Sequence, residues 1–331
     1  MRNQCPRILH IGPGRLSRGG VNTVINRLEE MKDIKVKRLE TFNGGPVSKK
    51  LLDGASSFLS APFNILWSNI VHIHCSLRSS SFRKLPFFLL ARFMRRPIVL
   101  HLHAPDFEDL TLNVADRLMI RRSEVVIVLS ESWRARMQKL VPREYSVVLN
   151  PADPKIVSRE KVSRFLYSGK LEHRKGFKEL IIAFSNLHDS IGTLALAGDG
   201  EIQQAKELVS WLGAREKIQV LGWQDEKEVR RLYETSRFFV LPSRAEGLPM
   251  SLIDSIAAGC IPIVTYVGGV PDVCKSNNSI QISTVSVEAI EKALRFALEA
   301  SKEIKENPMR DRISAQSVHF ELMKVYSKIL Q

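Results

Sequence analysis

Residues 239–274 read FVLPSRAEGLPMSLIDSIAAGCIPIVTYVGGVPDVC, and this stretch decides the expected fold. Two short apolar runs, which end at Leu241 and Thr265, read as strands on either side of one helical segment. Glu246 stands in the glycine-bearing loop before that helix, and Asp254 stands on the helix itself. A helix start offers free backbone N–H groups and the positive end of the helix dipole, which suit a phosphate. Carboxylates beside a phosphate suit a ligand that also carries sugar hydroxyls.

The same alternation of strand and helix runs through the whole chain. Apolar runs such as 8–11, 70–74 and 98–103 alternate with helical patterns, and the alternation resumes after the linker-like segment 150–154, which reads NPADP. Alternating units of this kind predict parallel sheets with right-handed crossovers. We therefore expect an α/β protein of two doubly wound, Rossmann-like domains whose sheets face a central cleft. Ligands should bind there, at the carboxyl ends of the strands.

A length of 331 residues favours two domains over a single core. The pattern places an N-terminal domain at 1–150 and a C-terminal domain at 151–310. The last helical segment, 311–331, is expected to pack back toward the N-terminal domain.

The net charge of +14 is unevenly distributed along the chain. Residues 1–150 contain 24 basic and 12 acidic side chains, whereas residues 151–331 contain 25 and 23. A basic N-terminal half indicates an anionic partner, which could be a membrane surface, a nucleic acid or a phosphorylated substrate. A solvated basic surface that serves only solubility is the alternative.

Cysteine use and hydropathy indicate a cytoplasmic protein. The four cysteines are scattered with no CxxC pair, which argues against a zinc site and against a disulfide framework. No apolar run reaches the roughly 18 residues that a membrane-spanning helix needs. The N-terminal residues enter a strand pattern at once and lack a secretory apolar region.

The glycine loop after the first strand admits two interpretations. Gly12-Pro13-Gly14 nearly matches the dinucleotide fingerprint of oxidoreductases, but Pro13 removes a backbone donor and Ser17 replaces the third glycine. Gly19 and Gly20 are better placed, because they precede a helix and let a ligand approach its first turn. The chain has no P-loop, HExxH or GxSxG motif. The acidic run Asp106 to Asp109 reads as a solvated loop rather than a metal site.

The spacing of Glu246 and Asp254 resembles the donor-binding signature of glycosyltransferase family 4, whose members have the GT-B fold. Residues 168–177, which read SGKLEHRKGF, look like the family segment in which an arginine and a lysine flank the donor diphosphate. Residues 197–200, which read AGDG, resemble the end of its next strand. In the N-terminal half the glycine pair and a histidine at a strand end, His103, are similar to family features.

This resemblance implies a role for each candidate residue. Lys170 and Lys175 would neutralise the leaving diphosphate, and the N–H groups of Met250 and Ser251 would meet its oxygens. Glu246 would accept hydrogen bonds from sugar hydroxyls, and His103 would contact the transferred sugar. The other donor-binding candidates are Gly19, Gly20, Gly198 and Asp254, the last of which would hold the ribose.

Two residues depart from the family pattern. Asp254 replaces the usual second glutamate, so its shorter side chain must lie closer to the ribose or act through a water. Lys170 replaces the usual arginine, which keeps the charge and loses the bidentate fork.

The resemblance implies transfer of a sugar from a nucleoside diphosphate sugar to an acceptor hydroxyl, with retention of configuration and no metal. The N-terminal domain would bind the acceptor, a lipid-linked sugar or an oligosaccharide in assembly of O-antigen, capsule or exopolysaccharide. The helical segment 82–93, with basic flanks, could lie on the inner face of an anionic membrane or simply cover the sheet. Nucleic acid is not expected as a partner, because no binding module is recognised. A nucleotide-sugar epimerase, a dinucleotide oxidoreductase and a nucleic-acid-binding protein are the alternatives.

Overall fold

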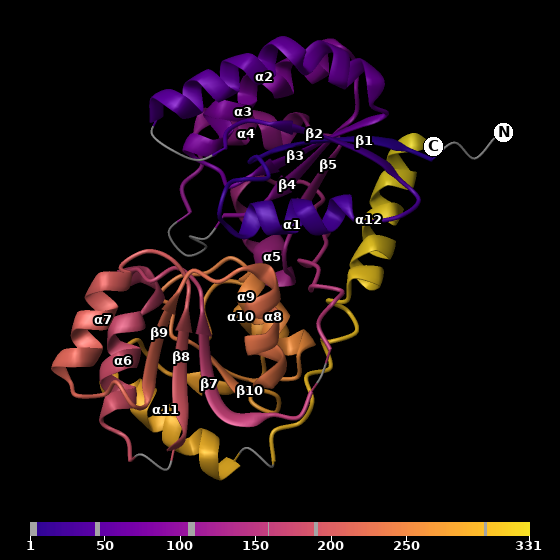
Figure 1. The fold of residues 1–331 in the computed structure, drawn as a ribbon. Helices are drawn as coiled ribbons and strands as arrows, with labels where there is room; N and C mark the ends of the chain where they lie inside the picture. The colour runs from indigo at the N-terminus through magenta and orange to yellow at the C-terminus, as the bar shows by residue number, and fades with distance from the viewer. Residues whose placement is uncertain (1–4, 44–46, 105–109, 158, 189–190, 301–302) are drawn as a thin grey trace. The chain divides into compact units, whose positions relative to one another are not determined.

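The computed structural model describes residues 5–43, 47–104, 110–157, 159–188, 191–300 and 303–331, which form two compact units (Figure 1). Unit 1 comprises Met1–Pro151 and Ala315–Gln331, and unit 2 comprises Ala152–Ser314. Each unit has a six-stranded sheet in which all strand pairs are parallel. The predicted α/β class, with two parallel sheets, is therefore confirmed. The acidic run Asp106 to Asp109 lies outside the described residues.

Unit 1 has the strand order β2-β1-β3-β4-β5-β6. Its strands are β1 (Arg7–Gly12), β2 (Lys35–Glu40), β3 (Ile70–Cys75), β4 (Ile98–Leu102), β5 (Val125–Val128) and β6 (Ser146–Val147). Its helices are α1 (Gly20–Glu29), α2 (Val47–Trp67), α3 (Ser79–Phe93), α4 (Val114–Arg122), α5 (Glu131–Leu140) and α12 (Ala315–Leu330). Helices α2, α3 and α4 cover one face of the sheet, and α1 and α12 lie on the other (Figure 1).

Unit 2 has the strand order β12-β11-β10-β7-β8-β9. Its strands are β7 (Val162–Ser168), β8 (Thr193–Ala197), β9 (Ile218–Gly222), β10 (Ser236–Leu241), β11 (Ile261–Thr265) and β12 (Ile280–Ile282). Its helices are η1 (His173–Lys175), α6 (Phe177–Ser185), α7 (Ile202–Trp211), α8 (Glu226–Thr235), α9 (Met250–Ala257), α10 (Val270–Val273) and α11 (Val287–Ala300).

Local sequence signals explain several of these elements, but they did not predict the long helix α2. Serine is a favoured N-cap residue, and the hydroxyl of Ser130 accepts a hydrogen bond from the N–H of Trp133 at 3.2 Å at the start of α5. The sequence did not predict α2, because Gly54 and Pro62 interrupt its helical pattern. Its packing on the sheet and on α3 outweighs these two unfavourable residues. Within the described residues, no helix is long and apolar enough to cross a membrane.

Candidate donor site and the histidine array

The candidate donor site of unit 2 lies where its strand order reverses. Strands β7 and β10 are neighbours, although three helix-linked steps of the chain separate them. In open parallel sheets, ligands bind at the carboxyl ends of strands at such a reversal point. Residues 169–175 follow β7, and the loop that carries Glu246 follows β10. The topology therefore brings these two segments to the same edge of the sheet.

Glu246 is the centre of the charged cluster at this edge. Lys175 Nζ donates a hydrogen bond to Oε1 of Glu246, and Nη1 of Arg174 lies 3.9 Å from Oε2. The same Nη1 donates to the carbonyl oxygen of Ala245 at 2.6 Å. The side chains of Glu246 and Lys175 are only 5% and 12% exposed. A carboxylate this buried requires such partners, since an unpaired buried charge is strongly destabilising.

Lys170 occupies a different place in the cluster. Its side chain is 58% exposed, and its Nζ lies 3.1 Å from Oε2 of Glu172. Arg174 Nη2 donates to Oε1 of the same glutamate at 2.8 Å. Burial alone would raise the pKa of Glu172, but the hydrogen bonds and charges of Lys170 and Arg174 outweigh it and lower that pKa. Three cations and two carboxylates thus alternate along this edge.

The loop around Glu246 is held by a close backbone approach that only glycine permits. A Cβ added to Gly268 would lie 1.7 Å from the carbonyl oxygen of Glu246, and the φ of Gly268 is +58°. The next residue, Gly269, donates its N–H to the carbonyl oxygen of Gly247 at 2.7 Å. The loop after β11 therefore packs against the backbone of Glu246 and Gly247 and fixes the position of Glu246 relative to the sheet.

The start of α9 lies at the end of the same loop. The helix begins at Met250 after Pro249, and no side chain in the described structure caps it. Met250 and Ser251 form its first turn, where backbone N–H groups have no partner within the helix. These N–H groups and the helix dipole provide the features predicted for a phosphate contact.

Asp254 and Gly198 have structural contacts in unit 2. Oδ1 of Asp254 accepts a hydrogen bond from the N–H of Asp153 at 3.1 Å, so this carboxylate joins α9 to the first residues of the unit. A Cβ on Gly198 would lie 1.8 Å from the carbonyl oxygen of Gly169, which explains the glycine at that position. The donor-binding roles of both residues stay predictions.

The three remaining candidates, Gly19, Gly20 and His103, lie in unit 1. Gly19 precedes α1 with a φ of +139°, and Gly20 is the first residue of that helix. His103 follows β4, where its N–H donates to the carbonyl oxygen of Cys75 at 2.8 Å. Its side chain is 9% exposed and belongs to a larger group of histidines.

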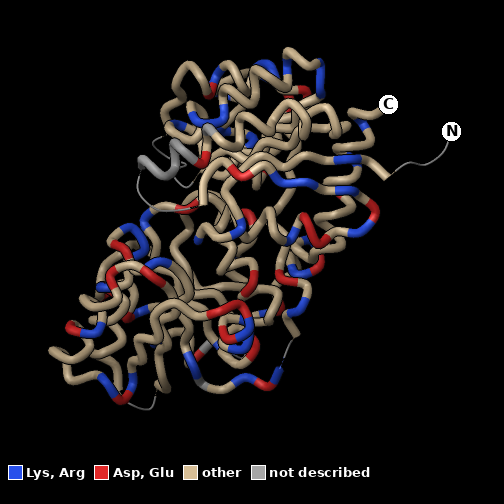
Figure 2. Tube along the Cα trace, turned by 45° about the horizontal axis from the view of Figure 1, so that its top comes forward, with Lys and Arg blue, Asp and Glu red and all other residues tan. Residues whose placement is uncertain are grey.

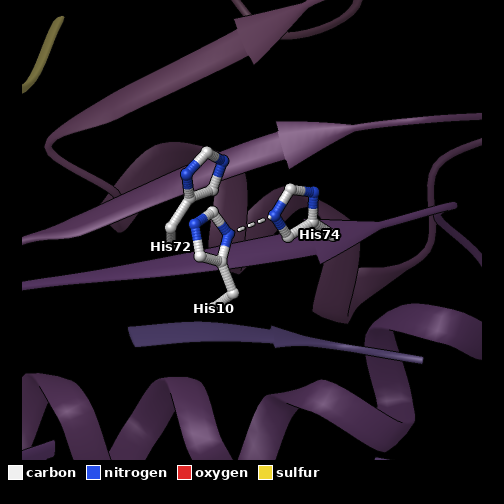
Figure 3. A group of neighbouring side chains, drawn as sticks. All are labelled: His10, His72 and His74. Carbon is white, nitrogen blue, oxygen red and sulfur yellow. Dashed lines mark hydrogen bonds between the residues drawn. The ribbon is translucent and has the colours of Figure 1, made fainter. Parts of the chain in front are cut away.

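Five of the eight histidines gather on the face of the unit 1 sheet that α12 covers. They are His10, His72, His74, His101 and His103, hereafter the histidine array. Figure 3 shows three of them on the neighbouring strands β1 and β3. His101 and His103 are two residues apart at the end of β4, a spacing that puts both on one face, and their ring centroids are 4.1 Å apart. The spacing of His72 and His74 carried the same signal, but the strand order is needed to bring all five together.

Burial sets the electrostatics of the histidine array. It lowers the pKa of His10 to about 3, with a further contribution from the charge of Arg38, and it lowers the pKa of His103 to about 3 with a contribution from Lys84. Burial also places the pKa of His72, His74 and His101 well below the ordinary value. The array is therefore neutral near pH 7. Two triads of the array bring their ring nitrogens within 4.8 Å of one another, close enough to be candidate metal sites. They are His10, His72 and His74, and His74, His101 and His103.

A family model described as glycosyl transferases group 1 matches residues 151–317, which include the whole charged cluster around Glu246. The chain belongs to this family. The solved structure of Anabaena Alr3699/HepE in complex with UDP and glucose resembles the chain with a TM-score of 0.77 and 15% identity, over 98% of this chain and all of that one. This likeness confirms the GT-B fold, whereas the predicted cleft between the two domains stays a prediction.

Two curated relatives extend the comparison of this group 1 member. A putative teichuronic acid biosynthesis glycosyltransferase, TuaC of Bacillus subtilis, is 25% identical over 254 residues, which are 69% of this chain and 61% of the relative. A Campylobacter jejuni N-acetylgalactosaminyltransferase, whose name specifies an undecaprenol-diphosphate-linked acceptor, is 32% identical over 126 residues, 37% of this chain and 34% of the relative. The chain thus aligns with less than two thirds of the length of each relative.

Proposed function

We propose that this protein transfers a sugar from a nucleoside diphosphate sugar to an acceptor hydroxyl, with retention of configuration and without a metal. The observation that carries the proposal is the contact of Lys175 and Arg174 with the buried carboxylate of Glu246, at the reversal point of the sheet in a group 1 domain. Unit 2 would bind the donor, and unit 1 would bind the acceptor.

In this mechanism the charged cluster acts on the leaving diphosphate. Lys175 and Arg174 are held beside Glu246 before the donor arrives, so their charges need little rearrangement as negative charge develops on the leaving group. The first turn of α9 would contribute N–H groups from Met250 and Ser251. Glu246 would accept hydrogen bonds from sugar hydroxyls and so orient the reacting carbon. We assign no protein nucleophile.

The proposed acceptor is a lipid-linked sugar or an oligosaccharide used in building a bacterial surface polysaccharide. The undecaprenol-linked acceptor in the name of the Campylobacter relative and the teichuronic acid role in the name of TuaC support this class. The enzyme would then work at the inner face of the membrane that holds its acceptor.

The surface of unit 1 supports contact with an anionic membrane. Large apolar side chains stand exposed on α2 and α3, including Phe63 at 78% and Phe93 at 85% exposure. They recur along each helix at a spacing close to whole turns, so each helix presents an apolar stripe: Leu59, Phe63 and Leu66 on α2, and Phe82, Leu89 and Phe93 on α3. Apolar stripes with basic neighbours are typical of helices that lie in a membrane interface.

Basic residues surround the end of the α3 stripe. A cavity of about 590 Å³ lies there, and its lining contains the basic residues Arg92, Arg95, Arg96, Arg143 and Lys328 and two acidic ones, Glu124 and Glu144. The lysines and arginines of the chain can be followed in Figure 2. An excess of cations beside exposed aromatic rings favours anionic phospholipid headgroups over neutral ones.

The donor is best identified by measuring which ligands bind, before any transfer activity is measured. Each nucleotide and nucleotide sugar in a panel is tested for thermal stabilisation of the protein, and a ligand at 100 times its Kd should add about 2.7 kcal/mol. The best donor is then incubated alone and with lipid-linked or oligosaccharide acceptors. Transfer to an acceptor supports the proposal, whereas interconversion of the donor without an acceptor would identify an epimerase instead.

The charged cluster is tested by two substitutions. Glu246→Gln and Lys175→Met should each lower transfer by about 10²-fold or more, since they remove charge that the transition state uses. Glu291→Gln, which breaks the ion pair of Glu291 with Arg295 on α11 of the same unit, is the matched control and should keep transfer. Near-normal transfer by both cluster variants would refute this site.

A further inference from the structure

The histidine array contains one continuous line of hydrogen-bonded rings that ends at His103. His10 Nδ1 lies 2.8 Å from Nε2 of His74, and His74 Nδ1 lies 3.0 Å from Nε2 of His103. The ring centroids are 5.0 and 5.2 Å apart, and the planes of each pair differ by 27° and 24°. These rings therefore meet edge to edge, as a hydrogen bond between imidazoles requires. The dashed line in Figure 3 marks the bond between His10 and His74.

A second line lies against the first. Tyr326 Oη is 2.6 Å from Nδ1 of His72, whose Nε2 is 3.3 Å from Nδ1 of His101. The ring of His72 stacks on that of His74, with centroids 4.4 Å apart and planes 12° from parallel. Each possible metal triad combines rings from both lines. Because an imidazole lone pair lies in its ring plane, stacked rings do not aim at a common ion, so this geometry favours hydrogen bonding over coordination.

Neutral rings leave the first line only two arrangements of its protons. Each neutral imidazole has one N–H and one lone pair, and each contact needs one of each. In one arrangement His10 donates to His74, His74 donates to His103, and His103 carries its proton on Nδ1. In the other, every proton moves to the opposite nitrogen, so that His103 carries its proton on Nε2.

The two ends of the line distinguish these arrangements. Nε2 of His10 is buried and has no hydrogen-bond partner in the described chain. A buried N–H without an acceptor is rarer in proteins than an unused acceptor, so the arrangement that leaves a lone pair there is favoured. At the other end, Nδ1 of His103 makes no hydrogen bond within the described residues, and His103 keeps 9% of its surface exposed.

We propose that His74 and His10 are positioning residues that fix His103 in the Nδ1–H tautomer. His103 then presents a neutral N–H donor at the carboxyl end of β4, and it serves neither as a cation nor as a base. The tautomer follows from unit 1 alone. Only the identity of the oxygen that this N–H meets, a hydroxyl of the transferred sugar, rests on the proposed function.

The tautomer is measured directly by NMR of the full chain labelled with ¹⁵N-histidine, without any substrate. Ring signals of His103 are identified by their loss in His103→Asn. We expect the proton on Nδ1, and no change of charge between about pH 5 and 8. A proton on Nε2, a charged ring in this range, or one equivalent of metal retained by the purified protein would each overturn the proposal. Because no turnover is measured, failure here is separate from failure of the proposed transfer activity.

Two variants of the same strand test the direction of the line. His74→Leu removes the donor to Nε2 of His103, and the proton should then move to Nε2, the position that a free histidine side chain prefers. His72→Leu removes an equally buried ring two residues away that belongs to the other line, and it should leave the proton on Nδ1. An unchanged tautomer in His74→Leu would contradict the positioning role. If His74→Leu does not fold, the spectrum of the wild-type protein still decides.

Discussion

At the scale of single residues, the position of the loop that carries Glu246 depends on Gly268. Gly268→Ala would place a methyl group 1.7 Å from the carbonyl oxygen of Glu246, so the loop must move away. We expect donor affinity and transfer to fall at least tenfold, because the carboxylate leaves the geometry that Lys175 and the sugar require. The measurement is donor Kd together with the initial rate of transfer.

Gly213→Ala provides the matched control for this substitution. Gly213 has a φ of +65°, close to the +58° of Gly268, but nothing lies within 4 Å of an added Cβ there. Both variants incur about 1–2 kcal/mol for a left-handed alanine, so only the contact with Glu246 differs between them. Equal loss of donor binding in both would show that backbone strain, and not the position of Glu246, is responsible.

The sequence singled out Glu246 and Lys175 as candidate site residues, but it did not indicate that Arg174 lies beside this carboxylate. Three cations stand in residues 168–177, and spacing along an irregular loop does not reveal which of them points at a glutamate far along the chain. The short helix η1 decides this, because it directs Arg174 and Lys175 toward Glu246, while Lys170 pairs with Glu172. Loop geometry, rather than residue type, was the missing information.

At the scale of elements, the histidine array makes the stability of unit 1 depend on pH. The pKa of His10 and His103 is lowered to about 3, whereas in the unfolded chain it returns to about 6.5. Between these pH values the unfolded chain binds more protons than the folded chain. The free energy of unfolding therefore has its full value above about pH 6.5 and falls as the pH decreases below it. Each such imidazole contributes a slope of about 1.4 kcal/mol per pH unit.

The effect is measured by denaturant unfolding of unit 1 at several pH values from 7.5 to 5. This series covers about the upper half of the range between the folded and unfolded pKa values. His10→Phe should reduce the slope by about one proton, because it removes one of the low-pKa rings. His188→Gln removes an exposed histidine of unit 2 and should leave the slope of unit 1 unchanged. Stability that is flat or rises on acidification over this range would contradict the charge state assigned to the array.

The elements themselves were largely predictable, whereas their lateral arrangement was not. Apolar runs and caps such as Ser130 are local signals, so most strands and helices of the described chain could be located from the sequence. The histidine array depends on β1, β3 and β4 being adjacent in the sheet. Sequence alternation gives the face of each strand, but it does not give the order of strands.

At the scale of the whole molecule, charge and exposed apolar surface together predict where the protein works. The basic excess of residues 1–150 was evident from composition, but the sequence left open whether segment 82–93 covers the sheet or faces a membrane. In the structure, Phe87 and Phe88 of α3 are buried, while Phe82 and Phe93 of the same helix are exposed. A helix with two apolar faces is unusual for a protein surface that meets only water.

Co-sedimentation of the full chain with vesicles tests the proposed membrane contact. We expect binding to phosphatidylcholine vesicles that contain phosphatidylglycerol, and weaker binding when salt screens the charges. The double variant Phe63→Ser, Phe93→Ser should lower binding at least tenfold, since it removes two large apolar groups from the interface.

Trp211→Ser is the control for this double variant. It changes an equally exposed aromatic residue of unit 2 and should bind like the wild type. Absence of binding at low salt would refute a membrane role for unit 1, whereas equal loss in all variants would show that general surface hydrophobicity, and not the stripes on α2 and α3, drives it.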